Sequence, residues 1–331
     1  MLQRNMRRRP LANEGLMAKQ GFKLAAAQAA PILFDKAAST EKACALISEA
    51  AVNGADIVAF GEAWLPGYPF WVEGAVQDLT WEASAAYLEN AVIIGGAETQ
   101  ALCEAARAGG VDVVIGVAEK DPLTHGAAYC TALAISREGE ILGRHRKLKP
   151  THAERIIWGD GDAVGLKAHA RDYAKISALN CWEHQMMLPG YALAAQGTQV
   201  HCALWPGWEK IPRKEEYCWA RQHLLSRAFA SQAAAYVVCV AGIRLAKHIP
   251  DRWKPLGVWE HTGQSVIIDP RGEIIAGPID GEGILYAEGS LDVVRAAKAA
   301  CDIAGHYSRP DIFRLLVDDR PRPAAEFASE C

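Results

Sequence analysis

The chain has 331 residues, half of them hydrophobic, and a formal net charge of −4 at pH 7. A chain of this length and apolar content can bury a sizeable core, so one large domain is expected rather than two small ones. Acidic and basic residues are mixed along the chain, which gives no electrostatic reason to expect nucleic acid as a partner. No stretch approaches the roughly 18 consecutive apolar residues of a membrane span, so we expect a soluble protein.

Strand and helix patterns alternate almost to the end of the chain, which predicts an α/β fold. The expected strands span residues 22–29, 56–60, 111–118, 128–136, 141–145, 176–180, 200–204, 236–241, 265–268, 273–276 and 284–287. The expected helices span residues 40–52, 81–90, 98–108, 181–195 and 215–234. A turn signal at residues 137–140 predicts a hairpin between two of the strands.

The two ends of the chain differ in composition from the middle. Residues 1–20 carry the one basic cluster, four arginines that no apolar signal-like segment follows, and we expect a disordered extension there. Residues 21–300 are expected to form a single domain. Residues 301–331 form an irregular tail with the apolar side chains Ile312 and Phe313, which we expect to make contacts between subunits.

The nine cysteines lie mostly in apolar neighbourhoods, without paired short spacings, and their number is odd. This usage is typical of a reducing cytosol, so we expect a cytoplasmic protein. Eight of the nine are expected to be small buried hydrophobes. Cys181 is the exception because it stands where a short apolar strand stops and a helical pattern begins. Unpaired amides of a first helical turn would lower the pKa of such a thiol.

Two other segments supply groups that a reactive thiol needs. Glu62 and Lys147 each follow a predicted strand, as Cys181 does, and the ends of strands in α/β folds collect at one edge of a sheet. Acyl-type chemistry at a carbon bonded to nitrogen needs a nucleophile, a base and a positive group where negative charge develops. The sequence therefore predicts a triad of Glu62, Lys147 and Cys181.

Three segments around these residues, 60–69, 145–151 and 179–184, resemble the signature blocks of the carbon-nitrogen hydrolase (nitrilase) superfamily and occur in that family's order. The likeness extends over about residues 20 to 315. The resemblance implies a four-layer αββα sandwich, catalytic roles for the triad, and Glu154 as an additional active-site glutamate. Cys181-Trp182-Glu183-His184 resembles the true nitrilase branch.

The resemblance implies hydrolysis of an organic nitrile to the carboxylic acid and ammonia, through a thioimidate and a thioester on Cys181 and without a cofactor or metal. It also implies a homo-oligomer built from dimers that extend into spiral filaments in some relatives. From the sequence we expect Lys147→Ala and Glu62→Ala to lose turnover while folding normally. Glu183 is expected either to orient Lys147 or to cap the helix that follows it.

Several aromatic side chains lie near these blocks and are candidates for substrate binding. Tyr68 and Trp182 are favoured because they neighbour catalytic residues, and Trp64, His152 and Trp205 complete the set. Pure packing is an equal alternative for the tryptophans. An aromatic wall suits an aryl or arylalkyl nitrile as well as an aliphatic one, so the sequence leaves the substrate class open.

Other functions are compatible with parts of the pattern. An amidase, a carbamoylase or a cyanide-hydrating enzyme would use the same triad, and a chiefly structural, filament-forming homologue belongs to a different class. A papain-like enzyme would need His152, His223 or His306 as a base, without motif support. A metal site around Cys181 and His184 lacks the paired ligands of zinc sites.

Overall fold

The computed structural model describes residues 21–73, 77–208, 221–257 and 260–323. The expected disordered extension at residues 1–20 and the first six residues of the helix expected at 215–234 lie outside these ranges. Within them, no helix combines the length and the apolar character needed to cross a membrane.

Two six-stranded sheets form the centre of the fold. The first contains, in spatial order, β14 (Gly283–Ser290), β1 (Gly21–Gln28), β2 (Ile57–Phe60), β3 (Asp112–Lys120), β4 (Ala128–Ile135) and β5 (Ile141–Arg146). The second contains β13 (Ile274–Ala276), β12 (Val266–Ile268), β9 (Tyr236–Ala241), β8 (Val200–Trp205), β7 (Lys175–Asn180) and β6 (His169–Ala170). In each sheet three central strands are parallel and the outer pairings are antiparallel. The hairpin expected at residues 137–140 joins β4 to β5.

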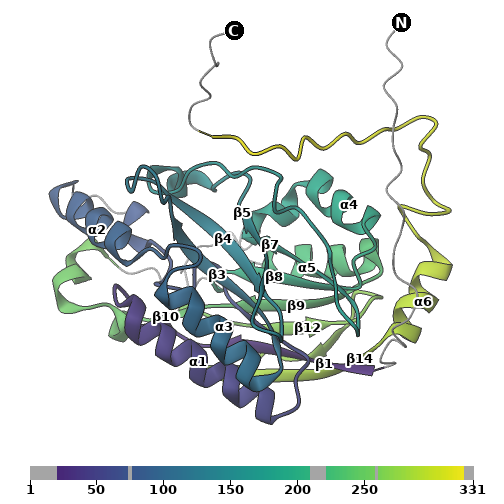
Figure 1. Cartoon of the computed structure of the whole chain (residues 1–331), viewed down its shortest axis with the longest axis horizontal. Coiled ribbons are helices and arrows are strands. Elements are labelled where there is room, and N and C mark those ends of the chain that lie inside the picture. The colour runs from purple at the N-terminus through teal and green to yellow at the C-terminus, as the bar shows by residue number, and fades with distance from the viewer. Residues whose placement is uncertain (1–20, 74–76, 209–220, 258–259, 324–331) are drawn as a thin grey trace, which may run out of the picture.

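The two sheets pack face to face, and helices cover their outer faces (Figure 1). Side chains alternate across β1, so Phe22 and Leu24 enter the core between the sheets while Ala25 and Ala27 pack under the helices. This double burial explains why β1 is apolar along most of its length.

Helices α1 (Lys36–Val52) and α3 (Ala97–Gly109) cover the first sheet, and α4 (Met187–Ala195) and α5 (Arg221–Ala233) cover the second. The α/β class and the αββα sandwich that the resemblance implied are therefore confirmed. Two further helices, α2 (Gln77–Asn90) and α6 (Leu291–Ala300), lie at the ends of the sandwich (Figure 1). The sequence predicted α2, starting four residues late, but not α6.

Two helix boundaries differ from the sequence-based expectation for local reasons. Helix α1 begins at Lys36 rather than residue 40, because the Asp35 carboxylate caps it by accepting from the Ala38 amide. The helix expected at residues 181–195 is broken. A 3₁₀ turn, η3 (Cys181–Gln185), is followed by the extended residue Met186, and α4 then starts with Pro189 in its first turn, where a missing N–H costs nothing.

Candidate active site

The three residues of the predicted triad lie at the ends of strands from both sheets. Lys147 directly follows β5, Cys181 directly follows β7, and Glu62 stands two residues after β2. The Glu62 amide donates to the Trp205 carbonyl at the end of β8, 3.1 Å away. A Cβ at Gly61 would lie 2.6 Å from the Gly242 nitrogen, so only glycine allows the two sheets to approach this closely beside Glu62.

Lys147 lies fully buried between two carboxylates. Its Nζ donates to Glu62 Oε1 at 2.7 Å and to Glu154 Oε2 at 2.6 Å, and its side chain has no exposed surface. Burial alone would lower the pKa of Lys147, but the charges of Glu154 and Glu62 raise it well above its usual value. The ammonium group therefore stays charged at neutral pH.

The Glu62 carboxylate has one occupied and one open oxygen. Oε1 accepts from Lys147 and also from the Cys130 thiol, whose sulfur is 3.5 Å away. Oε2 has no hydrogen-bond partner among the described residues. Burial raises the pKa of Glu62 to about 7, against the lowering effect of Lys147, and the charge of Glu154 adds to the rise. Such a carboxylate is suited to accept and return a proton near neutral pH.

The Cys181 thiol is protonated in this environment, contrary to the lowered pKa expected from its position at a helix start. Burial raises the pKa of Cys181 well above its usual value, and the charge of Glu62 raises it further. Lys147 and the backbone contact with Trp182 act in the opposite direction without prevailing. The thiol must therefore lose its proton to a base as it attacks.

The backbone at Cys181 is in the left-handed region, with φ +46°, which non-glycine residues seldom adopt. Glu183 anchors this turn from inside. Its two oxygens accept from the Asn180 amide and the Leu148 amide, each at 2.8 Å, and His145 Nε2 lies 3.0 Å from one of them. Glu183 therefore caps the turn that starts at Cys181 and ties this turn to the backbone of Leu148, while a role of Glu183 in orienting the Lys147 side chain stays a prediction.

We expect Glu183→Gln to lower kcat and to destabilise the fold by about 1–3 kcal/mol, because an amide has one acceptor oxygen where the two backbone amides need two. Glu288→Gln is the matched control, since the Glu288 side chain is 76% exposed. Urea unfolding and initial rates measure both effects. Equal behaviour of the two variants would contradict the role given to Glu183.

The aromatic candidates divide by their surroundings. The Tyr68 hydroxyl donates to Glu154 Oε1 at 3.0 Å, and its ring lies against Trp158. The half-buried Trp182 ring lies 5.8 Å from the ring of the exposed His152, centre to centre.

Trp64 and Trp205 are both packed into the core. The indole N–H of Trp64 donates to the Ala29 carbonyl at 2.8 Å, although its ring also borders a small cavity that Glu62 and Tyr68 line. The Trp205 ring stacks on His184. Substrate contact by Tyr68, Trp182, His152, Trp64 and Trp205 stays a prediction.

Two contacts of the site were not predicted from the sequence. Cys130 was grouped with the buried structural thiols, and it is buried, but it also donates to Glu62. Cys130 lies near the start of β4, which pairs with β5, the strand directly before Lys147. This position was a weak signal that Cys130 could lie near the site. His145 lies in the signature segment 145–151, yet nothing in its sequence separation from Glu183 indicated that the two side chains are in contact.

Comparison with known proteins gives consistent matches over nearly the whole chain. The family model described as "Carbon-nitrogen hydrolase" matches residues 23–299. A protein named Nitrilase 2, from an unknown prokaryotic organism, is 50% identical over 306 residues, covering 92% of this chain and 95% of its own length. An aliphatic nitrilase of Rhodococcus rhodochrous is 37% identical over 309 residues, covering 90% and 83%.

Among solved structures, the carbon-nitrogen hydrolase of Helicobacter pylori G27 has the same fold, with a TM-score of 0.71 at 16% identity over 89% of this chain and 97% of that chain. The family match spans both sheets and every candidate catalytic residue described above. The chain therefore belongs to the carbon-nitrogen hydrolase family.

Proposed function

We propose that the protein is a nitrilase, which hydrolyses an organic nitrile to the carboxylic acid and ammonia. The observation that carries the proposal is the buried group in which Lys147 bridges Glu62 and Glu154 beside the Cys181 thiol. A nucleophile, a base with a pKa near 7 and a fixed cation are the parts that this reaction needs. The similarity to proteins named nitrilase supports the choice of a nitrile over other substrates.

The first step forms a carbon–sulfur bond. Glu62 Oε2 accepts the thiol proton as the Cys181 sulfur attacks the nitrile carbon, and one bond of the triple bond becomes a lone pair on nitrogen. The charged Lys147 stabilises that negative charge, and the proton held by Glu62 then passes to the nitrogen. The product of this step is a neutral thioimidate on Cys181.

Water then converts the thioimidate to the acid. Glu62 or Glu154 takes a proton from a water molecule that adds to the thioimidate carbon, which gives a tetrahedral intermediate carrying an amine. Protonation of this amine releases ammonia and leaves a thioester, and a second water hydrolyses the thioester to the acid and the free thiol. Release of the thiol instead of ammonia would give the amide.

This scheme predicts the pH dependence of kcat/KM. Glu62 must be ionised to act as a base, so kcat/KM should fall as the pH decreases through about 7. Because the charge of Glu154 raises the pKa of Glu62, Glu154→Gln should move this fall to lower pH, in addition to any loss of kcat. Asp160→Asn removes an exposed carboxylate six residues further along the chain and should leave the pH profile of kcat/KM unchanged. A profile unmoved by Glu154→Gln would contradict the coupling.

We propose that Tyr68 and Trp182 contact the substrate, with His152 beside Trp182. Tyr68 supports this because its hydroxyl reaches Glu154 and its ring borders the same small cavity as Glu62. Trp182 supports it because it directly follows the nucleophile and is half-buried. Trp64 and Trp205, whose indoles are packed into the core, are proposed to support the walls of the substrate site.

A panel of aliphatic, aryl and arylacetonitriles, with their matching amides, tests the proposed reaction. Release of ammonia from nitriles with the acid as the main product is the expected result, and the rates rank the substrate classes. Turnover of amides alone would replace the proposal with an amidase or carbamoylase. Turnover of cyanide alone would replace it with a cyanide-hydrating enzyme, and no turnover of any compound would favour a structural homologue.

We also propose that the protein is a homo-oligomer built from dimers that can extend into filaments. Exposed apolar side chains of α4 and α5 support this, with Met187 82%, Leu188 64% and Leu224 62% exposed. Phe313 and Leu316 of the tail are also exposed. Size-exclusion chromatography with light scattering should give a mass above one chain, and a monomer at micromolar concentration would contradict the proposal.

A cytoplasmic location is proposed on the state of the cysteines. All seven cysteines within the described residues are free thiols, which is the usual state in a reducing compartment. Fractionation of the host cell with an antibody against the chain tests this, and recovery from a membrane or an oxidising compartment would contradict it.

A further inference from the structure

A chain of hydrogen bonds runs from the backbone of the nucleophile into the second sheet. His184 Nδ1 lies 2.7 Å from the Cys181 carbonyl oxygen, and His184 Nε2 lies 2.9 Å from His201 Nε2. His201 Nδ1 lies 2.8 Å from Ser177 Oγ, which in turn accepts from Thr198 Oγ1 at 3.1 Å. None of these four side chains has a role in the mechanism above.

The donor and acceptor properties of the atoms fix the direction of each hydrogen bond in this series. A carbonyl oxygen only accepts, so His184 Nδ1 must carry a hydrogen and donate to Cys181. Burial lowers the pKa of His184 to about 4 and that of His201 well below its usual value, so both rings are neutral. His184 Nε2 is then an acceptor, His201 Nε2 is the donor to it, and the Ser177 hydroxyl donates to His201 Nδ1.

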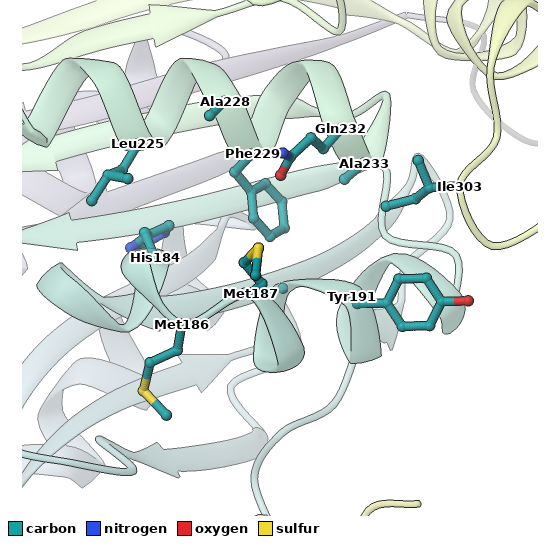
Figure 2. Close-up of a pocket in the computed structure, with 11 residues that line it drawn as sticks. His184, Met186, Met187, Tyr191, Leu225, Ala228, Phe229, Gln232, Ala233 and Ile303 are labelled. Carbon is teal, nitrogen blue, oxygen red and sulfur yellow. The ribbon is translucent and has the colours of Figure 1, made fainter. Parts of the chain in front are cut away.

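Packing holds both rings in place. His184 stacks on Trp205 with ring centres 5.5 Å apart, and His201 stacks on Phe229 with centres 3.9 Å apart. His201 is fully buried on β8, whereas His184 is one of the residues that line an apolar groove of about 250 Å³ between α4 and α5 (Figure 2). The imidazole of His184 therefore has one ordered orientation, with Nδ1 directed at the Cys181 carbonyl.

We propose that His184 is a positioning residue for the nucleophile, that its Nδ1–H holds the Cys181 carbonyl in the left-handed turn, and that His201 selects the tautomer of His184 that can do so. The turn at Cys181 has φ +46° and needs support from its surroundings. Glu183 supplies that support at the amide before Cys181, and His184 supplies it at the carbonyl. The inference rests on the proposed role of Cys181 as the nucleophile.

Four variants test the proposal. His184→Asn keeps an N–H close to the position of Nδ1, His184→Leu has the same number of side-chain heavy atoms as Asn but no donor, and His184→Gln places its N–H nearer to Nε2. His201→Phe keeps a ring against Phe229 and removes both nitrogens. For each variant, kcat and KM for a nitrile, the thermal unfolding midpoint and the rate of Cys181 alkylation by iodoacetamide, followed by peptide mass spectrometry, are measured.

We expect His184→Leu and His184→Gln to lower kcat by about 100-fold with KM changed by less than about threefold, because the sulfur is displaced from its attacking position. His184→Asn should recover at least tenfold of that loss. His201→Phe should lower kcat, and combined with His184→Leu it should add little further loss, since both act through one hydrogen bond.

The proposal is overturned if His184→Leu and His184→Gln retain the wild-type kcat, or if His184→Asn is no better than these two at equal unfolding midpoints. A folded His201→Phe variant with unchanged kcat would remove the tautomer role. The alkylation series needs no nitrile, so it reports on the position of Cys181 even if the protein hydrolyses a different substrate. Should His184→Leu fail to fold, the comparison of Asn with Gln carries the test.

Discussion

Lys147→Met is expected to abolish turnover and to lower the free energy of unfolding by about 3–5 kcal/mol at pH 8. The substitution leaves the carboxylates of Glu62 and Glu154 buried without the cation that pairs with both. From the sequence alone we expected a lysine variant at this position to fold normally. The complete burial of the Lys147 side chain replaces that expectation with a large loss of stability.

The loss should depend on pH in a definite direction. Lys147 lowers the pKa of Glu62, which burial raises to about 7 in the wild type, so loss of the cation raises this pKa further in the folded protein and the folded state of the variant binds a proton more tightly than the unfolded state. Its stability therefore recovers as the pH is lowered from 8 to 5.

Lys149→Met is the control, because it removes an exposed lysine that is paired with Asp160. It should lower the free energy of unfolding by less than about 1 kcal/mol. Urea unfolding of both variants at pH 5 and pH 8 measures the effect. Equal stabilities of the two variants at pH 8 would contradict the account of Lys147.

Glu62→Gln is expected to lower kcat by at least about 1,000-fold while leaving the free energy of unfolding at pH 8 unchanged or higher. The activity falls because the protonated Cys181 thiol loses the base that accepts its proton. The stability does not fall, because the wild-type site buries two carboxylates with one ammonium group. An amide at position 62 leaves Lys147 and Glu154 as a neutral pair.

The direction of the stability change caused by Glu62→Gln follows from the raised pKa of Glu62. A carboxyl whose pKa is about 7 in the folded protein and 4.5 in its ordinary state costs stability above pH 4.5, and this cost grows until about pH 7. Glu62→Gln removes that cost. Unfolding curves between pH 4 and pH 8, with initial rates at pH 8, measure both effects, and a variant that retains turnover would contradict the role of Glu62 as the base.

The sequence was a good guide to the fold and to which residues lie at the strand ends. Strand periodicity located β9 without error and most other strands within one or two residues, because doubly buried strands carry long apolar runs. The motif segments around Glu62, Lys147 and Cys181 predicted that these three residues form one site. Short edge strands such as β6 were not predicted, since two residues carry no readable period.

The electrostatics of the site were not predictable from local sequence. The expected low pKa of Cys181 came from considering the helix start alone, whereas burial against Glu62 outweighs it and raises the pKa of the thiol. The contact between Cys130 and Glu62 joins residues 68 positions apart, and the pairing of His184 with His201 joins the turn that follows β7 to the second residue of the neighbouring strand β8. Such contacts depend on the packing of the two sheets, which no single segment encodes.

The most direct test is ammonia release from a nitrile by the wild-type protein and Cys181→Ala, assayed side by side with identification of the carboxylic acid. Cys202→Ala, which removes another buried thiol, is the control. We predict that the wild type and the control form acid and ammonia while Cys181→Ala, with a similar unfolding midpoint, forms neither. Ammonia release by Cys181→Ala at the wild-type rate, or a wild type that releases ammonia from amides alone, would contradict the assignment of a cysteine-dependent nitrilase.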